Sequence, residues 1–199
     1  MIDQLPSLTM LLKHIQQVPY VASKNIYRVA NYFLDMPEER LEQFCAILLT
    51  AKNKLQHCSV CHAWQEKSGS CIFCSSLRRD ASLICVVQSW QEILAIEKTG
   101  GYNGVYHILG GLLCPLEGVG PEDLNIKTLV ARVTEATKEI ILAFDQTPEG
   151  EATAAYIVDS LKGKKVALSC FSRGMPVGSS LEMLDRLTVY KALSERRPW

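Results

Sequence analysis

The stretch CSVCHAWQEKSGSCIFC, residues 58–74, places four cysteines in the spacing C-x2-C-x9-C-x2-C. Each C-x2-C pair permits a tight turn that aims two thiolates at one point, and two such turns complete a tetrahedral shell with Zn–S distances of about 2.3 Å. All four ligands then come from the protein, so no position stays open for water and the site is structural rather than catalytic. The sequence therefore predicts one structural Zn²⁺ ion, whose ligands are Cys58, Cys61, Cys71 and Cys74.

Two other interpretations of these cysteines are a redox-active C-x2-C pair and a chance arrangement. One pair alone would leave both interpretations open, whereas two pairs this close in sequence do not. His57 and His62 flank the cluster. Because four cysteines already complete the shell, we expect both histidines to face solvent. The surrounding segment has little apolar periodicity, so it can form only a small hydrophobic core. A core this small needs a cross-link, such as a bound metal ion, to be stable.

The composition of the chain is that of a globular protein with no overall charge bias. It has 21 basic and 21 acidic side chains among 199 residues, so its formal net charge is zero. A protein that coats DNA usually carries a basic excess, and charge alone therefore allows only weak, local or partner-assisted DNA contact. No stretch approaches the roughly 18 apolar residues of a membrane span, and residues 1–10 do not resemble a secretory signal. We expect a cytoplasmic protein without a membrane partner.

The other four cysteines are dispersed along the chain. They are Cys45, Cys85, Cys114 and Cys170, each in an apolar context. The cytoplasm is reducing, so the eight cysteines do not predict four disulfides. Because free cysteines are commonly buried, we expect these four to be inert core residues.

Three apolar stripes at helical spacing precede the metal motif, at residues 8–15, 26–33 and 41–55. They predict an all-helical domain over residues 1–56. The third helix should bury one face, which consists of Leu41, Phe44, Leu48 and Leu55.

From residue 83 onward, short apolar strands alternate with helices. Strands are expected at residues 83–89, 105–109, 139–144 and 165–171. Helices are expected at residues 90–100, 121–137, 150–161 and 180–193. The first of these should begin with a capping box, formed by Ser89 and Glu92. This alternation indicates a parallel, wrapped sheet, in which ligands bind beyond the carboxyl ends of the strands. The residues at those ends are Gln88, Gly110, Asp145 and Arg173.

Residues 18–28, VPYVASKNIYR, lie between the first two predicted helices at the spacing of a helix-hairpin-helix. In that motif a glycine-rich hairpin lets backbone N–H groups approach a DNA phosphate, and a helix N-terminus adds its dipole. Tyr20 and Ala22 occupy the glycine positions, where a side chain obstructs close approach and disfavours positive φ. Lys24 and Arg28, four residues apart on one helix face, are the candidate DNA contacts. The alternative is that they form an ordinary solvated basic face.

Several segments together resemble the RecR family. The hairpin resembles the family pattern L-P-G-x-G-x-K-x-x-x-R, and residues 109–121 resemble L-x-G-x-x-S-P-L-x-G-x-G-P, with Cys114 in place of the usual serine. Residues 174–182 resemble G-x-P-x-G-x-x-L-E. Together with the cysteine motif, the resemblance spans nearly the whole chain.

The α/β half is similar to a Toprim domain. Toprim enzymes place a glutamate after the first strand and Asp-x-Asp after a later one, and the three carboxylates hold Mg²⁺ for phosphoryl transfer. Here Gln88 takes the glutamate position, and Asp145-Gln146-Thr147 keeps only the first acid of the later motif. We therefore predict no catalysis. Asp145 and Glu149 are instead candidates for docking a partner, although acids at a helix start also simply compensate the helix dipole.

The predicted fold class is α+β in four parts. These are a helix-hairpin-helix-like helical domain at residues 1–56, a four-cysteine zinc finger at 57–80, a Toprim-like α/β domain with a parallel sheet at 81–175, and a C-terminal helical segment at 176–199.

The RecR resemblance implies an accessory role in recombinational DNA repair. RecR-like proteins associate with RecO-like and RecF-like partners, help to load RecA onto single-stranded DNA, and assemble as ring-shaped homo-oligomers, often tetramers. A ring that encircles DNA would let a chain of zero net charge hold it, because the DNA is enclosed and needs only a few Lys and Arg side chains that face the inside of the ring. The resemblance also implies a bacterial, nucleoid-associated protein. Two other classes stay open: a Toprim-type magnesium-dependent phosphoryl-transfer enzyme, and a zinc-stabilised adaptor that binds only proteins.

Overall fold

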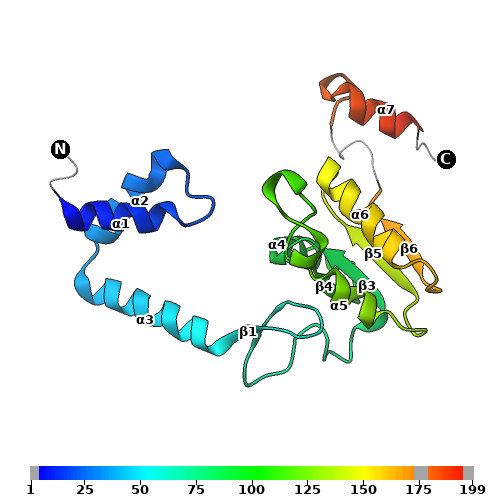
Figure 1. Ribbon diagram of the computed structural model, residues 1–199, viewed down its shortest axis with the longest axis horizontal. Coiled ribbons are helices and arrows are strands. Elements are labelled where there is room, and N and C mark those ends of the chain that lie inside the picture. Colours follow the sequence, from blue (N-terminus) through cyan, green and yellow to red (C-terminus); the bar gives the residue numbers. More distant parts are fainter. Residues whose placement is uncertain (1–4, 173–178, 195–199) are drawn as a thin grey trace. The chain divides into compact units, whose positions relative to one another are not determined.

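The structure, a computed structural model, describes residues 5–172 and 179–194. The chain divides into two compact units, with the boundary between Lys54 and Leu55. Figure 1 traces the chain from the N-terminal helices in blue to the C-terminal helix in red. The predicted α+β class is confirmed, because the structure contains N-terminal helices, a four-cysteine cluster, a parallel sheet and a C-terminal helix. In the described ranges, no helix is long and apolar enough to cross a lipid bilayer.

The first unit begins with two helices that pack against each other, α1 (Pro6–Gln16) and α2 (Ile26–Leu34). A single turn of 3-10 helix, η2 (Ser23–Asn25), leads into α2. The buried core of the pair consists of Ile15, Ile26 and Ala30. These residues belong to the first two apolar stripes, so the helical spacing in the sequence correctly identified the packed faces.

The third helix, α3 (Glu38–Lys54), differs from the prediction in its packing. Phe44 contacts Phe33 of α2, with ring centroids 5.5 Å apart, but no residue of α3 is buried. Leu48 is 60% exposed, and Leu55 begins a strand. The predicted buried face is therefore wrong for the single chain, because nothing else in the described residues covers this stripe.

A two-stranded antiparallel hairpin opens the second unit, and the sequence did not predict it. Strand β1 (Leu55–His57) pairs with β2 (Trp64–Glu66). Strands of three residues are too short to show an alternating pattern. The connection between them is the first C-x2-C turn, which carries no Gly or Pro signal of a hairpin.

The centre of the second unit is a four-stranded sheet of order β4-β3-β5-β6, in which each neighbouring pair is parallel. Its strands are β3 (Asp80–Val87), β4 (Gly104–Ile108), β5 (Glu139–Ala143) and β6 (Ala167–Cys170). Each overlaps its predicted range. Because parallel strands end at the same edge, the residues that follow them share that edge.

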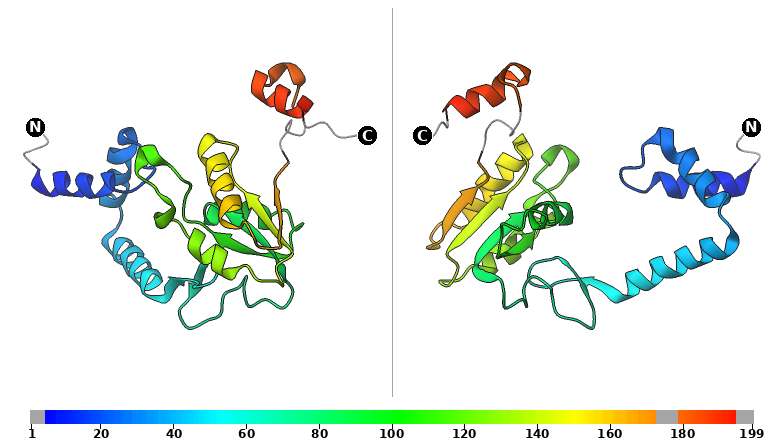
Figure 2. Two further views of the ribbon diagram at one scale, coloured as in Figure 1. Left: turned by 45° about the vertical axis from the view of Figure 1, so that its right-hand side comes forward. Right: turned by 180° about the vertical axis from the view of Figure 1, so that it is seen from behind.

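Side chains alternate between the two faces of the sheet and so define two cores. Ile84 lies in one core, which is covered by α5 (Ile126–Arg132) and α6 (Pro148–Ser160). Cys85 lies in the other core, which includes side chains of α4 (Trp90–Glu97) and of the cysteine segment. Figure 2 shows the sheet with its flanking helices from two sides. The metal motif therefore packs on the same face of the sheet as α4.

Helix boundaries follow local signals in some places and not in others. The predicted capping box is confirmed, since Ser89 N–H donates to Glu92 Oε2 over 2.7 Å at the start of α4. The helix predicted at residues 121–137 is shorter. Pro121–Asp123 form a 3-10 turn (η4), and α5 ends at Arg132 because the next residue is extended.

The predicted C-terminal helix is confirmed. A 3-10 turn, η5 (Leu181–Met183), precedes α7 (Arg186–Ser194). Arg173 and the glycine-rich residues 174–178, which the sequence singled out, lie outside the described residues. A further 3-10 turn, η3 (Pro115–Glu117), lies in the loop after β4.

Candidate metal centre and Toprim edge

The four cysteines of the metal motif converge on one point. Their Sγ atoms all lie within 4.8 Å of one another, and Cys61 Sγ lies 3.4 Å from Cys71 Sγ. A tetrahedral zinc site with Zn–S bonds of about 2.3 Å has its sulfurs about 3.8 Å apart. Cys58, Cys61 and Cys71 are buried, and Cys74 is partly buried. The cluster therefore has the size, ligand set and burial of a closed four-thiolate metal site.

Backbone hydrogen bonds shape the first C-x2-C turn and attach it to the sheet. His62 N–H donates to Cys58 O over 2.9 Å and closes the turn. Val60 N–H lies 3.4 Å from Cys58 Sγ, where it stabilises charge on the sulfur. Ile108 N–H donates to Cys61 O over 2.9 Å. The last residue of β4 thus holds the metal motif against the sheet.

Crowding and burial raise the pKa of two of these thiols. A hydrogen bond with Cys74, followed by burial, raises the pKa of Cys61 well above its ordinary value. Burial likewise raises the pKa of Cys71. Four thiolates therefore need a cation to share this pocket, and a coordinated metal ion deprotonates its thiols outright. Arg132 adds positive charge beside the site, since its Nη2 lies 4.0 Å from Cys74 Sγ.

The two flanking histidines are not part of the cysteine group. His57 is exposed, as predicted, and stacks on Trp64 with ring centroids 3.9 Å apart. His62 is only partly exposed, and its Nε2 lies 2.9 Å from Thr128 Oγ1 of α5. The prediction of a solvent-facing His62 is therefore wrong. The turn packs on the sheet, which directs this side chain toward α5 and toward the ring of buried His107.

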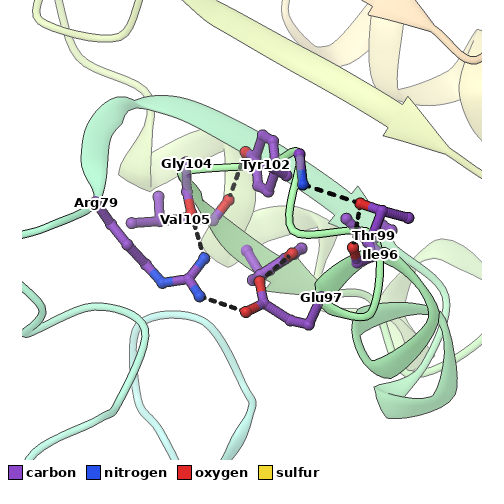
Figure 3. A network of polar contacts seen from close by, with 9 residues as sticks. Arg79, Ile96, Glu97, Thr99, Tyr102, Gly104 and Val105 are labelled. Atoms are coloured by element: carbon purple, nitrogen blue, oxygen red, sulfur yellow. Dashed lines mark hydrogen bonds and ion pairs between the residues drawn. The ribbon is translucent and has the colours of Figure 1, made fainter.

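A polar network ties the end of the metal segment to the sheet (Figure 3). Arg79 donates from Nη1 to Gly104 O over 2.9 Å and from Nη2 to Glu97 Oε2 over 2.6 Å. This hydrogen bond is the main reason that the pKa of Glu97 is lowered. The guanidinium also lies 5.1 Å from the centre of the Phe73 ring, inside the second C-x2-C turn. Arg79 therefore fixes that turn to the start of β4 and the end of α4.

The residues that the sequence assigned to a Toprim-like site lie at the carboxyl edge of the sheet, where its parallel strands end. Gln88 follows β3, Gly110 follows β4 and Asp145 follows β5. Asp145 is exposed, and Glu149 in the first turn of α6 is partly exposed. Among the described residues, the cysteine cluster is the one group of three or more His, Cys, Asp or Glu side chains that is close enough to hold one ion. The described part of the edge therefore lacks the triple carboxylate set of a Toprim enzyme.

Gln88 occupies the position where Toprim enzymes carry glutamate. Its Oε1 atom is buried and has no hydrogen-bond partner among the described residues. Leaving a buried polar atom unpaired costs about 1–3 kcal/mol. Gln88 thus keeps a hydrogen-bond acceptor at this position, but its neutral amide has no negative charge with which to bind a cation. Its main chain is integrated into the edge, because Gly110 N–H donates to Gln88 O over 3.0 Å.

The start of α6 holds the candidate docking acids in place. Thr147, which stands at the second acid of the Toprim Asp-x-Asp motif, is the N-cap, and its Oγ1 accepts from Gly150 N–H over 3.2 Å. Buried Thr153 donates to Glu149 O over 2.7 Å. The backbone of Gly150 lies so close to the backbone of Asp145 that a Cβ atom at position 150 would be 2.1 Å from Asp145 O. Thr147 therefore has a structural role here.

The helix-hairpin-helix-like segment keeps both predicted DNA contacts accessible. Lys24 lies in η2 and Arg28 in α2, and both are exposed. Ala22 has an ordinary extended backbone with φ −59°. Tyr20 instead has φ 66°, the left-handed conformation that favours glycine. One of the two glycine positions thus keeps a glycine-like backbone despite its side chain.

Charges are segregated along the chain although they sum to zero. Residues 4–34 contain three Lys or Arg and no acid. Residues 99–126 contain three acids, residues 139–161 contain five, and neither range contains Lys or Arg. The two acidic ranges include the loops after β4 and β5. A charge count over the whole chain missed this pattern, which a count by segment would have found.

The other four cysteines have different environments. Cys85 is buried in β3, and burial raises its pKa to about 12. Cys114 is partly buried, whereas Cys45 and Cys170 are exposed. The prediction of core cysteines is therefore wrong for Cys45 and Cys170, because nothing in the described residues covers α3 or the edge strand β6 at these positions.

These features define a class: a protein with a Toprim-like sheet, a four-cysteine metal motif and a helical N-terminal unit. The family model of the Toprim domain matches residues 82–172, and the model described as RecR, C-terminal matches residues 174–197. Relatives named recombination protein RecR include those of Tropheryma whipplei (strain TW08/27), 38% identical, and Ligilactobacillus salivarius (strain UCC118), 39% identical. Each alignment covers 94% of this chain and 94% of the relative. The chain belongs to the RecR family, as its resemblance predicts.

Proposed function

We propose that this protein is a non-catalytic, DNA-binding accessory protein of recombinational repair. It acts with RecO-like and RecF-like partners to help load RecA onto single-stranded DNA. Membership of a family whose relatives are named recombination proteins supports the general role. The observation that carries the DNA-binding part is the acid-free stretch of residues 4–34, whose cations are exposed beside a helix-hairpin-helix-like turn.

The proposed cofactor is one structural Zn²⁺ ion held by the four cysteines of the metal motif. The support is the convergence of their sulfurs within 4.8 Å. Four-sulfur tetrahedral sites favour zinc or iron–sulfur chemistry, and the C-x2-C pairs match the ligand spacing of zinc fingers. Such an ion stabilises the fold and takes no part in a reaction.

The absence of catalysis is also part of the proposal, and Gln88 and Thr147 support it. A Toprim enzyme needs carboxylates at both positions to neutralise Mg²⁺ and to align a phosphoryl group. Here the first position has a neutral amide, and the second has a hydroxyl group that caps α6. The remaining acid, Asp145, is exposed at the edge of the sheet and is available to a partner.

The acids of the sheet edge suit a basic protein surface. Residues 99–126 and 139–161 carry eight acids in total, three and five respectively, and contain no Lys or Arg. Lys127 and Lys162, just outside these ranges, pair with Glu122 and Asp159, so the two ranges remain acidic overall. Such a field repels DNA phosphates and attracts cationic side chains. We therefore assign Asp145 and Glu149 to docking of a RecO-like or RecF-like partner, while the N-terminal unit contacts DNA.

Removing two cations from the hairpin tests the DNA-binding role. The double substitution Lys24→Ala, Arg28→Ala should reduce the slope of log affinity against log salt by about 1.8 on duplex DNA and about 1.4 on single strands, because each phosphate contact releases condensed counterions. Fluorescence anisotropy over a salt series measures this slope. The same incubations with Mg²⁺ should leave the DNA intact.

The matched control is Arg40→Ala with Lys52→Ala, which also removes one arginine and one lysine from exposed positions of the first unit. These residues lie on α3, outside the acid-free stretch, so the slope should stay close to that of the unchanged protein. Equal slopes for both double variants would contradict the assignment of Lys24 and Arg28. Binding that does not depend on salt at all would contradict phosphate contact altogether.

Self-association into a ring, with a tetramer as the expected form, is the remaining part of the proposal. Its support is the row of exposed apolar side chains on α3, where Phe44 is 45% and Ile47, Leu48 and Leu49 are 60–61% exposed. Burial of one such side chain stabilises an interface by about 1.5–3 kcal/mol. A second copy of the chain would remove this surface from water.

The substitution Leu48→Glu should lower the mass in solution, because a charge in an apolar interface is strongly unfavourable. Light scattering coupled to size-exclusion chromatography measures the mass. Asn53→Glu, at an exposed position of the same helix, is the control and should leave the mass unchanged. Helix content measured by circular dichroism should be the same in both variants, since both positions are exposed within the chain. An unchanged mass for Leu48→Glu would exclude α3 from the interface.

A further inference from the structure

Tyr20 is an exposed aromatic residue with an unusual backbone conformation. It lies in the turn between α1 and α2, and its φ is 66°. Side chains rarely adopt this left-handed region, because the Cβ atom approaches the neighbouring carbonyl oxygen. The residue is 104% exposed relative to an extended reference. The fold thus places a large ring in water at a strained position and gains no packing within the described chain in return.

The turn around Tyr20 is well defined. Val18 N–H donates to Ile15 O over 3.0 Å and Val21 N–H donates to Val18 O over 3.4 Å. Ile15 is one of the three buried residues of the α1–α2 core, and Val21 packs against that core. The ring is therefore presented by a turn that is fixed on both sides, so a ligand would not have to order it first.

The charges around the turn favour a polyanion. Lys13 and His14 lie in the last turn of α1, and Lys24 and Arg28 follow the turn between α1 and α2; all four are exposed. The acid-free range of residues 4–34 surrounds them. Exposed aromatic rings among cations are the composition of surfaces that bind single-stranded nucleic acid, where bases stack on the rings and cations track the phosphates.

From these observations we infer that Tyr20 stacks on an unpaired nucleobase, so that the hairpin binds single-stranded DNA in preference to a duplex. This inference rests on the proposed DNA-binding function and adds a ligand class to it. In a paired duplex the base faces are stacked on one another and are not available to a side chain. The same ring that prevents close approach of the hairpin backbone to a duplex phosphate provides a platform for an unstacked base.

Three variants of the full-length protein test this inference. Tyr20→Gly suits the left-handed backbone and should keep or raise the melting temperature, so a loss of binding would not reflect unfolding. Its affinity for an oligothymidylate should fall about tenfold, within the range for loss of one base–aromatic stack. Tyr20→Phe keeps the ring and should retain the affinity. Tyr32→Ala removes another exposed tyrosine, on α2, and should also retain it.

The comparison with a duplex of equal length makes the result specific. Affinity for the duplex should be unchanged or higher in Tyr20→Gly, because no base stack is lost and the hairpin can approach more closely. Equal loss on both DNA forms, or no loss on oligothymidylate, would overturn the stacking role while leaving DNA binding intact. If the unchanged protein binds neither DNA form at low salt, the proposed DNA-binding function itself fails, and the inference fails with it.

Discussion

Substitution of Cys61 by serine should unfold the metal segment and lower the stability of the sheet domain. Cys61 is fully buried, and its carbonyl oxygen accepts the hydrogen bond from Ile108 N–H at the end of β4. Binding free energies of structural zinc in isolated fingers are about 10–16 kcal/mol, and this energy is folding energy. Loss of one of four thiolates should therefore cost several kcal/mol, among the largest effects of any single substitution.

Two measurements check this prediction. Bound zinc, determined by atomic spectroscopy, should fall from about one ion per chain toward zero, and the melting temperature should fall with it. Chelation of the unchanged protein should reproduce both changes. Cys45→Ser is the matched control, since Cys45 is exposed on α3 and does not belong to the metal group. An unchanged melting temperature after complete chelation would show that the cysteines are not a structural metal site.

The substitution Gly150→Ala should destabilise the sheet domain by about 3 kcal/mol, at the upper end of overpacking effects. A Cβ atom at this position would lie 2.1 Å from Asp145 O and 3.5 Å from Phe144 Cβ. The obstacle is a backbone carbonyl group, which no side-chain rotation can move. The start of α6 would have to shift, and Asp145 and Glu149, the two acids proposed to dock a partner, would shift with it.

Chemical denaturation of both proteins gives the difference in unfolding free energy. Gly101→Ala is the matched control, because a Cβ atom there meets only Thr99 Oγ1 at an ordinary 3.6 Å. That variant should be neutral or slightly more stable, since alanine restricts the unfolded chain. If Gly150→Ala is as stable as Gly101→Ala, the close approach between α6 and Asp145 is not present in solution. Partner binding should weaken in Gly150→Ala alone.

Local signals in the sequence were sufficient for most of the fold. The strand at residues 83–89 and the capping box at Ser89 were predicted because strand and helix starts depend on side chains within a few residues. The cysteine set was predicted for the same reason, since metal geometry imposes a fixed spacing. The short β1–β2 hairpin escaped prediction because its strands have three residues each, too few to show an alternating pattern.

Predictions about burial were less successful, because burial depends on what lies opposite. The apolar stripe of α3 was expected to face a core, yet Leu48 is 60% exposed in the single chain. His62 was expected in solvent, yet it contacts Thr128 of α5, which is 66 residues away in sequence. In both cases local spacing identified the side chains, but it did not show whether another element of the chain packs against them.

The sequence by itself determined the four-cysteine group that could hold a metal ion, the alternation of strands and helices, and the shortage of acids at the Toprim positions, since each depends on residue identity at fixed spacing. Only the tertiary structure decided that Gln88 Oε1 is buried without a partner, that Gly150 touches the backbone of Asp145, and that Tyr20 adopts a positive φ in full exposure. The reason is physical. These properties arise from atoms brought together by chain packing and backbone geometry, and side-chain identity along the chain does not specify them.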